Sequence, residues 1–264
     1  MSGGSIELGF WNLAAAYIFT LILLFIVRIR KINREKLILI AAFRMSLQLM
    51  ITGYLLMYVF QYPNPFITIL IVLIMTSFAY FNVKKRCSFP LSKKLKRAIA
   101  LSLCFGTLPC LVFFIVCVIG AKPWFHPQYF IPVAGMIVGN SMTGVSLGVN
   151  RLCADMADKR DIIENSLMLG AAPKDAVHPL ANDAFDSAIL PTINQMVGMG
   201  IVSLPGMMTG QILAGTLPLT AIQYQIAIML GISGSVSITV LLFVTLGARA
   251  FFNSQDQLVF DVKQ

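Results

Sequence analysis

The sequence predicts an all-α, polytopic membrane protein of about seven transmembrane helices, organised as one transmembrane domain over residues 1–264. Its composition supports this class: hydrophobic residues make up 58% of the chain and charged residues only 12%. A soluble domain carries about 25% charged residues. The apolar residues also stand in long blocks, each close to the roughly 20 residues that a helix needs to cross a bilayer.

Seven apolar blocks follow one another along the chain. They cover residues 10–27, 37–60, 66–82, 99–121, 131–149, 192–214 and 219–248. The first block follows a short stretch without basic residues, so it is interpreted as a retained span rather than a cleaved signal peptide. The linkers are short or basic, except for residues 151–191, which are interpreted as one long cytoplasmic loop.

The basic residues indicate how the spans are oriented. The net charge is +9, and positive charges gather in residues 28–36 and 84–97, which join spans one and two and spans three and four. Because basic residues stay in cytoplasmic loops, the N-terminus is predicted outside and the C-terminus in the cytoplasm. Trp124, Phe125 and Tyr129 fit an outer aromatic belt. The basic linkers are expected to contact anionic membrane lipids rather than nucleic acid.

Five cysteines, without a C-x-x-C pair, predict no disulfide framework. Cys110 and Cys117 share one helix face in the fourth span, which also contains Cys104. Two interpretations stay open for that face, a thiol metal site or packing residues, and packing is favoured. Cys87 and Cys153 are predicted on the cytoplasmic side.

Two enzyme motifs are missing from the sequence. The chain has two histidines and no H-E-x-x-H motif, which disfavours a membrane-embedded metalloenzyme. It also has no G-x-x-x-x-G-K-[ST] phosphate loop. This chain is therefore predicted not to be an enzyme, and any ATP that drives it must be hydrolysed on another polypeptide.

The long cytoplasmic segment contains most of the acidic residues and predicts a helix–turn–helix elbow at the inner membrane face. Its first part, DMADKRDIIENSLMLGAAPKDA, is predicted as a helix. Asp155, Asp158 and Asp161 are placed in its first turns, where negative charge suits the helix dipole. Gly170 stands where a C-terminal glycine cap belongs, and Pro173 can begin the next helix.

This elbow resembles the EAA-type loop of ABC-transporter permeases, which docks a short helix into a cleft of a partner ATPase. The resemblance rests on Glu164, the Leu-Gly-Ala run at 169–171 and the Leu-Pro pair at 190–191, although that last pair falls later than in the common version. A solvated loop with a glycine cap is the alternative for this segment taken alone. The coupling residues that the resemblance implies are Glu164, Leu167, Leu169, Gly170, Ala171 and Pro173.

Four stretches of the C-terminal half resemble a second, narrower family. They are IPVAGMIVGNSMTGVSLGVNRL, LMLGAAPKDAV, AILPTINQMVGMGIVSLPGMMTGQILAG and YQIAIML. In order and spacing they are similar to the FetB-type iron-export permeases of bacteria, whose plant relatives are aluminium-sensitivity proteins. The resemblance implies a permease of the cell (plasma or inner) membrane that pairs with a separate ABC ATPase and exports iron or a related metal species. It also implies two permeases with two ATPases, ATP and Mg²⁺ on the ATPase, and no cofactor bound by this chain.

The sixth block contains residues that weaken a helix. Pro205 removes a backbone hydrogen bond and Gly206 loosens the next turn, and broken backbone in a membrane is tolerated inside the protein or along a wet cavity. Leu204–Gly210 is therefore predicted as a hinge beside the transport pathway, with a packing kink as the alternative. Glycines four residues apart predict close helix contacts. These pairs are Gly135 with Gly139, Gly144 with Gly148, and Gly206 with Gly210.

The candidate pathway ligands are neutral oxygens and thioethers, because no Asp or Glu lies well inside a span. They are Asn140, Ser141, Asn194, Gln195, Thr209 and Gln211, with Met136, Met142, Met207 and Met208. Thioethers favour soft ions, so the fit to bare Fe(II) is moderate. The candidate metal ligands are Met207, Met208 and Asp183. Asp183 and Asp186 either hold a cation at the inner mouth, pair with Arg44, or belong to a solvated loop.

Arg44 is a charge inside the second span, with Gln48 one turn further along the same face. It either faces the pathway, as intramembrane charges often do, or reaches the cytoplasmic interface with its long side chain. A pathway position would suit an anion, so the alternative cargo is an organic anion such as a nucleotide sugar or a metal chelate. A stand-alone channel or carrier is a further alternative.

Overall fold

The computed structural model describes residues 9–253 and 255–259. Over these residues the chain is helical apart from turns and two isolated bridges, which confirms the all-α class. The predicted domain, residues 1–264, extends beyond the described part. The elements are α1 (Phe10–Ile29), α2 (Glu35–Gln61), α3 (Pro65–Arg86), α4 (Lys93–Phe113), the π-helix η1 (Phe114–Ile119), α5 (Pro127–Asp158), α6 (Arg160–Met168), α7 (Pro173–Gly198), α8 (Gly206–Leu213) and α9 (Pro218–Arg249).

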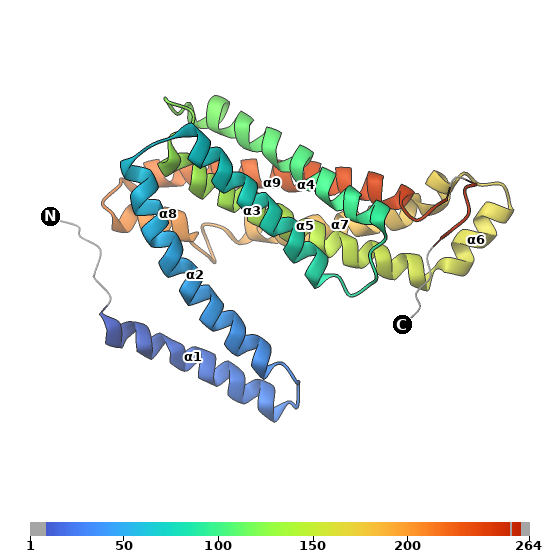
Figure 1. The fold of residues 1–264 in the computed structure, drawn as a ribbon, viewed down its shortest axis with the longest axis horizontal. Coiled ribbons are helices and arrows are strands. Elements are labelled where there is room, and N and C mark those ends of the chain that lie inside the picture. The colour runs from blue at the N-terminus through green and yellow to red at the C-terminus, as the bar shows by residue number, and fades with distance from the viewer. Residues whose placement is uncertain (1–8, 254, 260–264) are drawn as a thin grey trace.

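Six helical spans in the described chain are long and apolar enough to cross a membrane: α1, α2, α3, α4 with η1, α5 and α9. They match six of the seven predicted blocks and confirm a polytopic membrane protein. Figure 1 shows α3, α4, α5, α7 and α9 as one bundle, with α6 at one end and α8 towards the other. The end that carries α6 also carries the C-terminus of α3 and the N-terminus of α4 (Figure 1), where the lysines and arginines of residues 84–97 lie, and we call it the basic end.

The predicted sixth span, residues 192–214, is wrong as a single helix. Helix α7 ends at Gly198, residues 199–205 form turns and extended backbone, and α8 begins only at Gly206. Helix α7 nevertheless runs beside α5 and α9. It therefore runs along the bundle between its two ends (Figure 1).

The predicted long loop, residues 151–191, is also corrected. Its first residues continue α5, its middle forms α6, and its last part is the first half of α7. Helix α7 was missed because its first half, residues 173–186, contains charged and amide side chains, so no apolar block reveals it, although one stripe of the helix is buried. The buried stripe consists of Val177, Leu180, Ala184, Ala188 and Thr192.

The acidic start predicted for the elbow helix is partly wrong. Asp161 does lie in the first turn of α6, but Asp155 and Asp158 belong to the last turns of α5. Asp155 is buried and forms an ion pair with Arg151, with 2.9 Å between Oδ2 and Nε. The prediction failed because α5 continues well past the apolar block from which it was located.

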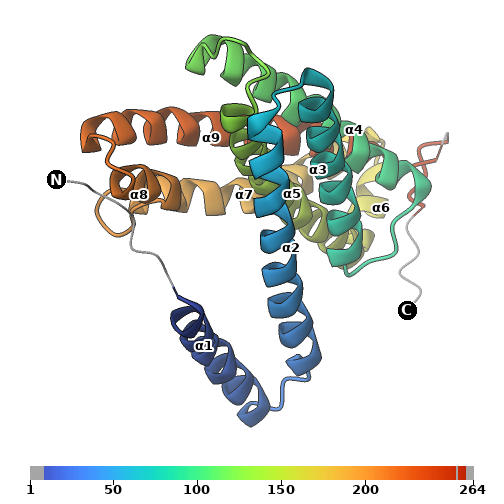
Figure 2. The same cartoon turned by 60° about the vertical axis from the view of Figure 1, so that its left-hand side comes forward.

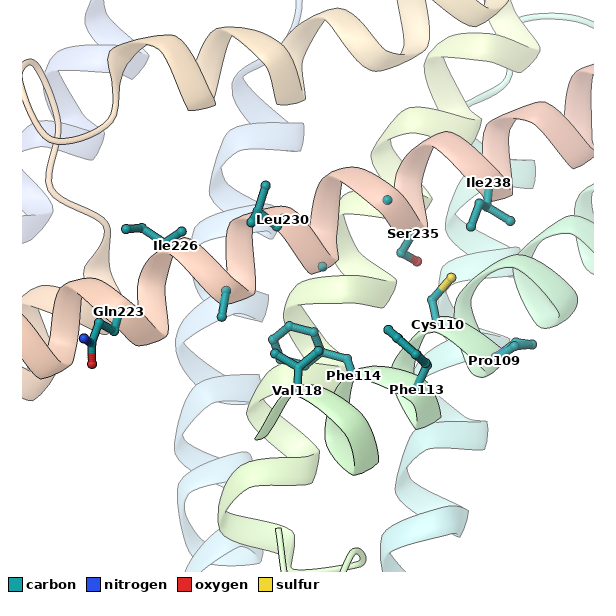
Figure 3. Close-up of a pocket in the computed structure, with 13 residues that line it drawn as sticks. Pro109, Cys110, Phe113, Phe114, Val118, Gln223, Ile226, Leu230, Ser235 and Ile238 are labelled. Carbon is teal, nitrogen blue, oxygen red and sulfur yellow. The ribbon is translucent and has the colours of Figure 1, made fainter. Parts of the chain in front are cut away.

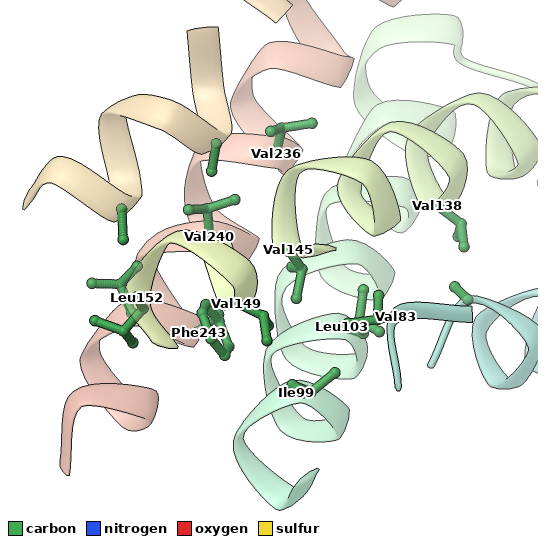
Figure 4. Packing of buried hydrophobic residues seen from close by; sticks show 14 of the residues in the cluster. Val83, Ile99, Leu103, Val138, Val145, Val149, Leu152, Val236, Val240 and Phe243 are labelled. Atoms are coloured by element: carbon green, nitrogen blue, oxygen red, sulfur yellow. The ribbon is translucent and has the colours of Figure 1, made fainter. Parts of the chain in front are cut away.

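The core lies where α3, α4, α5 and α9 meet, with α7 completing it. Figure 4 shows valine and leucine side chains from these helices converging around Val145 and Val149 of α5, with the ring of Phe243 beside them. Lipid offers little hydrophobic gain between helices, so this contact depends on close van der Waals packing.

The glycine pair of α5 makes the close contact that its spacing predicts. A Cβ added to Gly144 would lie 3.0 Å from Val236 and 3.1 Å from Val240 of α9, and one added to Gly148 would lie 3.5 Å from Ala188 of α7. Small residues therefore let α5 approach two neighbours at once. The other pairs do not show this in the described chain: Gly139, Gly206 and Gly210 face open space, and Gly135 meets only Met75.

The tightest glycine contacts were not predicted. A Cβ on Gly106 of α4 would lie 2.6 Å from the Cα of Thr239 on α9, and a Cβ on Gly231 of α9 would lie 2.6 Å from the ring of Phe114. Neither glycine has a partner four residues away, so the spacing rule could not find them.

Helices α1 and α2 form a hairpin that diverges from the bundle (Figure 2). They pack mainly on each other, and most of their apolar side chains are exposed. In a membrane-spanning chain such side chains face lipid or another protein.

Candidate functional site

The elbow at the basic end has the predicted geometry. Gly170 adopts a left-handed conformation, with φ +91°. The Gly170 amide donates to the carbonyl of Leu167, and the Ala171 amide donates to that of Ser166, which is the Schellman arrangement for a helix end. Pro173 begins α7 at its first position. The backbone conformation of Gly170 and these two hydrogen bonds confirm the predicted cap and turn.

The elbow divides its apolar residues between the core and the solvent. Ile163 is buried and Leu167 packs against the core. Leu169 is 90% exposed, and Met168 and Ile162 are exposed beside it. We call these last three residues the elbow tip. An exposed apolar group beyond the membrane-spanning bundle is typical of a protein-docking surface.

The other predicted coupling residues support the tip rather than form it. Glu164 is ion-paired with Arg160 one turn earlier, with 2.8 Å between Oε1 and Nε. Sequence reasoning missed Ile162 and Met168. Their signal was an apolar side chain on the polar face of a strongly amphipathic helix.

The second candidate region is the break between α7 and α8. Gly200 has φ +86°, and the amide of Gly200 donates to the carbonyl of Ser203 across the turn. Pro205 caps α8, so Gly206 to Gly210 are helical rather than unwound. The interruption of the helix therefore lies a few residues earlier than the predicted Leu204–Gly210, in residues 199–205.

Buried amide oxygens mark the contact of this break with α9. The side-chain oxygens of Gln211 on α8 and Gln225 on α9 are buried without a hydrogen-bond partner, and α8 packs on α9. The Gln225 amide nitrogen lies 3.9 Å from the sulfur of Met199. Met208 is buried and Met207 packs against the core. This region thus combines free amide oxygens with thioethers, a donor set for a soft or weakly hydrated cation.

Gln211, Met207 and Met208 were expected here, whereas Gln225 and Met199 were missed. The available signal for Gln225 was an amide side chain near the start of a mostly apolar span, which also contains Gln223.

Several predicted pathway residues lie elsewhere. Asn140 bonds its own helix, with 2.8 Å from its amide nitrogen to the Met136 carbonyl. Asn194 and Gln195 are exposed on α7. Ser141 lies 3.3 Å from Ser235, measured between the two hydroxyl oxygens, and joins α5 to α9. The structure therefore does not gather all the polar residues of the spans into one site.

Asp183 is not near the methionines. It lies on α7, where it pairs with Lys159 at 3.5 Å between Oδ2 and Nζ, and about 22 Å of helix separates it from Gly198. The described residues contain no group of three or more His, Cys, Asp or Glu side chains that could hold a metal. The three proposed metal ligands, Met207, Met208 and Asp183, therefore do not form one site.

Arg44 packs on a neighbouring helix. Its guanidinium carbon lies 5.3 Å from the centre of the Phe78 ring on α3, a cation–π distance. Both Arg44 and Gln48 are exposed on α2. Asp183 therefore pairs with Lys159 rather than with Arg44.

A cavity of about 760 Å³ lies between α9 and the α4–η1 segment. Figure 3 shows it lined by rings and aliphatic chains such as Phe113, Phe114 and Leu230, with Cys110 near Ser235. Such an apolar lining suits hydrocarbon rather than an ion. We therefore place the candidate cation-binding region at the break and not in this cavity.

Replacing Gln225 by leucine is expected to separate stability from transport. The change removes a buried amide oxygen that has no partner, so the folded state should be equally stable or more stable by about 1 kcal/mol. Transport should fall if that oxygen receives the cargo. The measurements are the thermal unfolding midpoint in detergent and uptake by inside-out vesicles. Gln223→Leu on the exposed face of α9 is the matched control, and unchanged transport in Gln225→Leu would show that the amide is structural.

Comparison with known proteins agrees with this architecture. The model of an uncharacterised protein family, UPF0014, matches residues 10–252. A UPF0014 membrane protein of Synechocystis is 38% identical over 216 residues, which is 82% of this chain and 83% of the relative. The probable iron export permease protein FetB of Escherichia coli is 35% identical over 94% of both chains. The protein ALUMINUM SENSITIVE 3 of Arabidopsis thaliana is 31% identical over 93% of this chain and 88% of the relative.

No solved structure matches the chain. The fold and the relatives together define a multi-pass permease of the cell membrane. The chain belongs to the UPF0014 family.

Proposed function

We propose that this chain is the membrane subunit of an ABC transporter that exports iron or a related metal species, driven by ATP that a separate ATPase hydrolyses. The observation that carries the proposal is the elbow tip, Ile162, Met168 and Leu169, which exposes apolar side chains at the basic end. The cargo class comes from the relative named as a probable iron export permease.

The elbow is built to transmit movement. Lys159 alone separates α5 from α6, and residues 169–172 alone separate α6 from α7. A push on α6 therefore reaches two long helices that pack on each other and on α9. Two such permeases with two ATPases would close and open around a shared pathway, as alternating access between two packed states requires. ATP and Mg²⁺ bind the ATPase in this scheme, and this chain itself needs no cofactor.

The cargo would pass the break between α7 and α8. Free amide oxygens of Gln211 and Gln225 and nearby thioethers can replace water around a cation at this point. The turn at residues 199–205 gives the backbone freedom to move there.

The test is purification of the chain with a co-expressed ABC ATPase, followed by ATPase assays with iron, other metals and metal chelates. We expect the two proteins to copurify and iron to stimulate hydrolysis above that of the ATPase alone. If an organic anion stimulates hydrolysis and no metal does, the proposed cargo changes from a metal species to an organic anion. Purification without any ATPase would overturn the assignment to an ABC transporter.

A further inference from the structure

A groove of about 600 Å³ opens between the first half of α7 and the last turns of α9. It lies at the basic end, because the Lys94 amine at the start of α4 donates to the carbonyl of Phe252, a residue of the groove, at 2.9 Å. The groove includes no residue of the elbow tip, of the break between α7 and α8, or of the basic linkers. It is therefore separate from the docking surface and the cargo path proposed above.

Each of the two helices contributes one face to the groove, since side chains four residues apart lie on the same helix face. The exposed rims are formed by Lys174, His178 and Asn182 of α7 and by Leu241, Thr245 and Arg249 of α9. The floor between them is apolar and consists of Val177, Ala181, Val244 and Ala248. The groove thus combines a hydrocarbon surface with polar and cationic edges.

The polarity of the groove changes with depth in the membrane. Helix α7 leaves the basic end and α9 arrives there, so Lys174 and Arg249 lie at the same end of the groove. Leu241 lies about 12 Å of helix further into the bundle than Arg249, in a helix that is apolar enough to cross a membrane. The cations therefore stand where lipid head groups begin, and the apolar part faces the depth of the acyl chains.

The positive charges of the groove are available to a ligand. Lys174 and Arg249 are exposed, and neither forms an ion pair with another residue of the described chain. Among the described residues that line the groove, Asp256 is the one carboxylate, so the two cations exceed it. Basic pockets between membrane helices on the cytoplasmic side suit anionic lipid head groups.

An amphipathic anion fits this groove better than either of its halves would. A soluble anion would leave the apolar floor in contact with water, and a plain hydrocarbon would leave two cations without a counter-charge. The 760 Å³ cavity beside α4 differs in this respect, because no charged side chain lines it.

We propose that this groove binds one anionic phospholipid from the leaflet at the basic end, with its phosphate at Lys174 and Arg249 and an acyl chain along the apolar floor. Ala172 and Pro173 border the same groove, so the lipid would join α7 to α9 directly beside the elbow. Anionic lipid would thereby restrain the short segment that connects α6 to α7.

The test reconstitutes the full-length chain in vesicles of equal parts phosphatidylglycerol and phosphatidylcholine, extracts it in mild detergent and counts the retained lipids by native mass spectrometry. We expect one phosphatidylglycerol per chain to be retained in preference to phosphatidylcholine. Joint replacement Lys174→Gln and Arg249→Gln should lower this retention at least about tenfold, because each basic residue adds to the attraction for anionic lipid. Lys85→Gln with Arg86→Gln removes the same charges from exposed positions at the end of α3 and should retain the lipid.

Thr245→Trp tests the apolar part of the groove without a change of charge. The indole ring extends from the exposed rim over the floor and should displace the lipid to the same extent. Thr143→Trp on an exposed position of α5 is the matched control. Both threonine hydroxyls donate to a carbonyl four residues earlier in their own helix, so the two substitutions remove the same hydrogen bond.

The remaining outcomes would each overturn the proposal. Equal retention of both lipids, unchanged retention in either groove variant, or an equal loss in the Lys85 and Arg86 control would show that no lipid site is built here. Displacement of phosphatidylglycerol by an equal concentration of glycerol 3-phosphate would indicate a site for soluble anions. Loss of a copurifying ABC ATPase from the Lys174 and Arg249 variant, with lipid retention unchanged, would make the groove a protein contact.

Discussion

Replacing Leu169 by glutamate is expected to reduce ATP-driven transport by at least about tenfold while the chain still folds and inserts. Leu169 is 90% exposed, so the protein's own core does not depend on it. If the elbow tip is buried in an ATPase, the substitution places a carboxylate in an apolar contact, and burial of an unpaired charge is costly. The measurements are copurification of the ATPase, ATP hydrolysis and transport in reconstituted vesicles.

Leu217→Glu is the matched control for this prediction. Leu217 is 73% exposed at the start of α9, at the opposite end of the bundle from the elbow. The same chemical change there should leave ATPase binding intact. Normal transport in Leu169→Glu would remove the elbow tip from the mechanism, and equal losses in both variants would point to a general defect in insertion.

Replacing Gly106 by alanine is expected to prevent normal packing of α4 on α9. The new methyl group would lie 2.6 Å from the Cα of Thr239, and a backbone atom cannot move aside as a flexible side chain can. The helices must separate, at a cost of about 3 kcal/mol. The folded yield and the thermal midpoint in detergent should both fall.

Gly234→Ala is the control for Gly106→Ala, because Gly234 lies on α9 and an added Cβ there meets no atom within 4 Å. It should keep or slightly raise the thermal midpoint, since alanine favours helix over glycine. A wild-type midpoint in Gly106→Ala would show that α4 and α9 do not pack as closely as the structure has them.

The sequence predicted the elbow more accurately than it predicted the break between α7 and α8. At the elbow, Gly170 favours the left-handed backbone of a helix cap and Pro173 favours the first position of a helix. The cap lies at Gly170 and α7 begins at Pro173, as these residues predict. At the break, Pro205 correctly predicted an interruption of the helix. Its position was shifted, however, because Pro205 caps a new helix that begins at Gly206, so the non-helical residues precede the proline instead of following it.

The sequence alone determined the membrane class, six of the spans, the glycine cap of α6 and the interruption between α7 and α8. Each of these depends on residues that are neighbours along the chain. Only the tertiary structure decided the exposure of Leu169, the free oxygen of Gln225 and the contact of Gly106 with Thr239. Each of these depends on the rotation and register of helices distant in sequence, and a one-dimensional pattern contains neither.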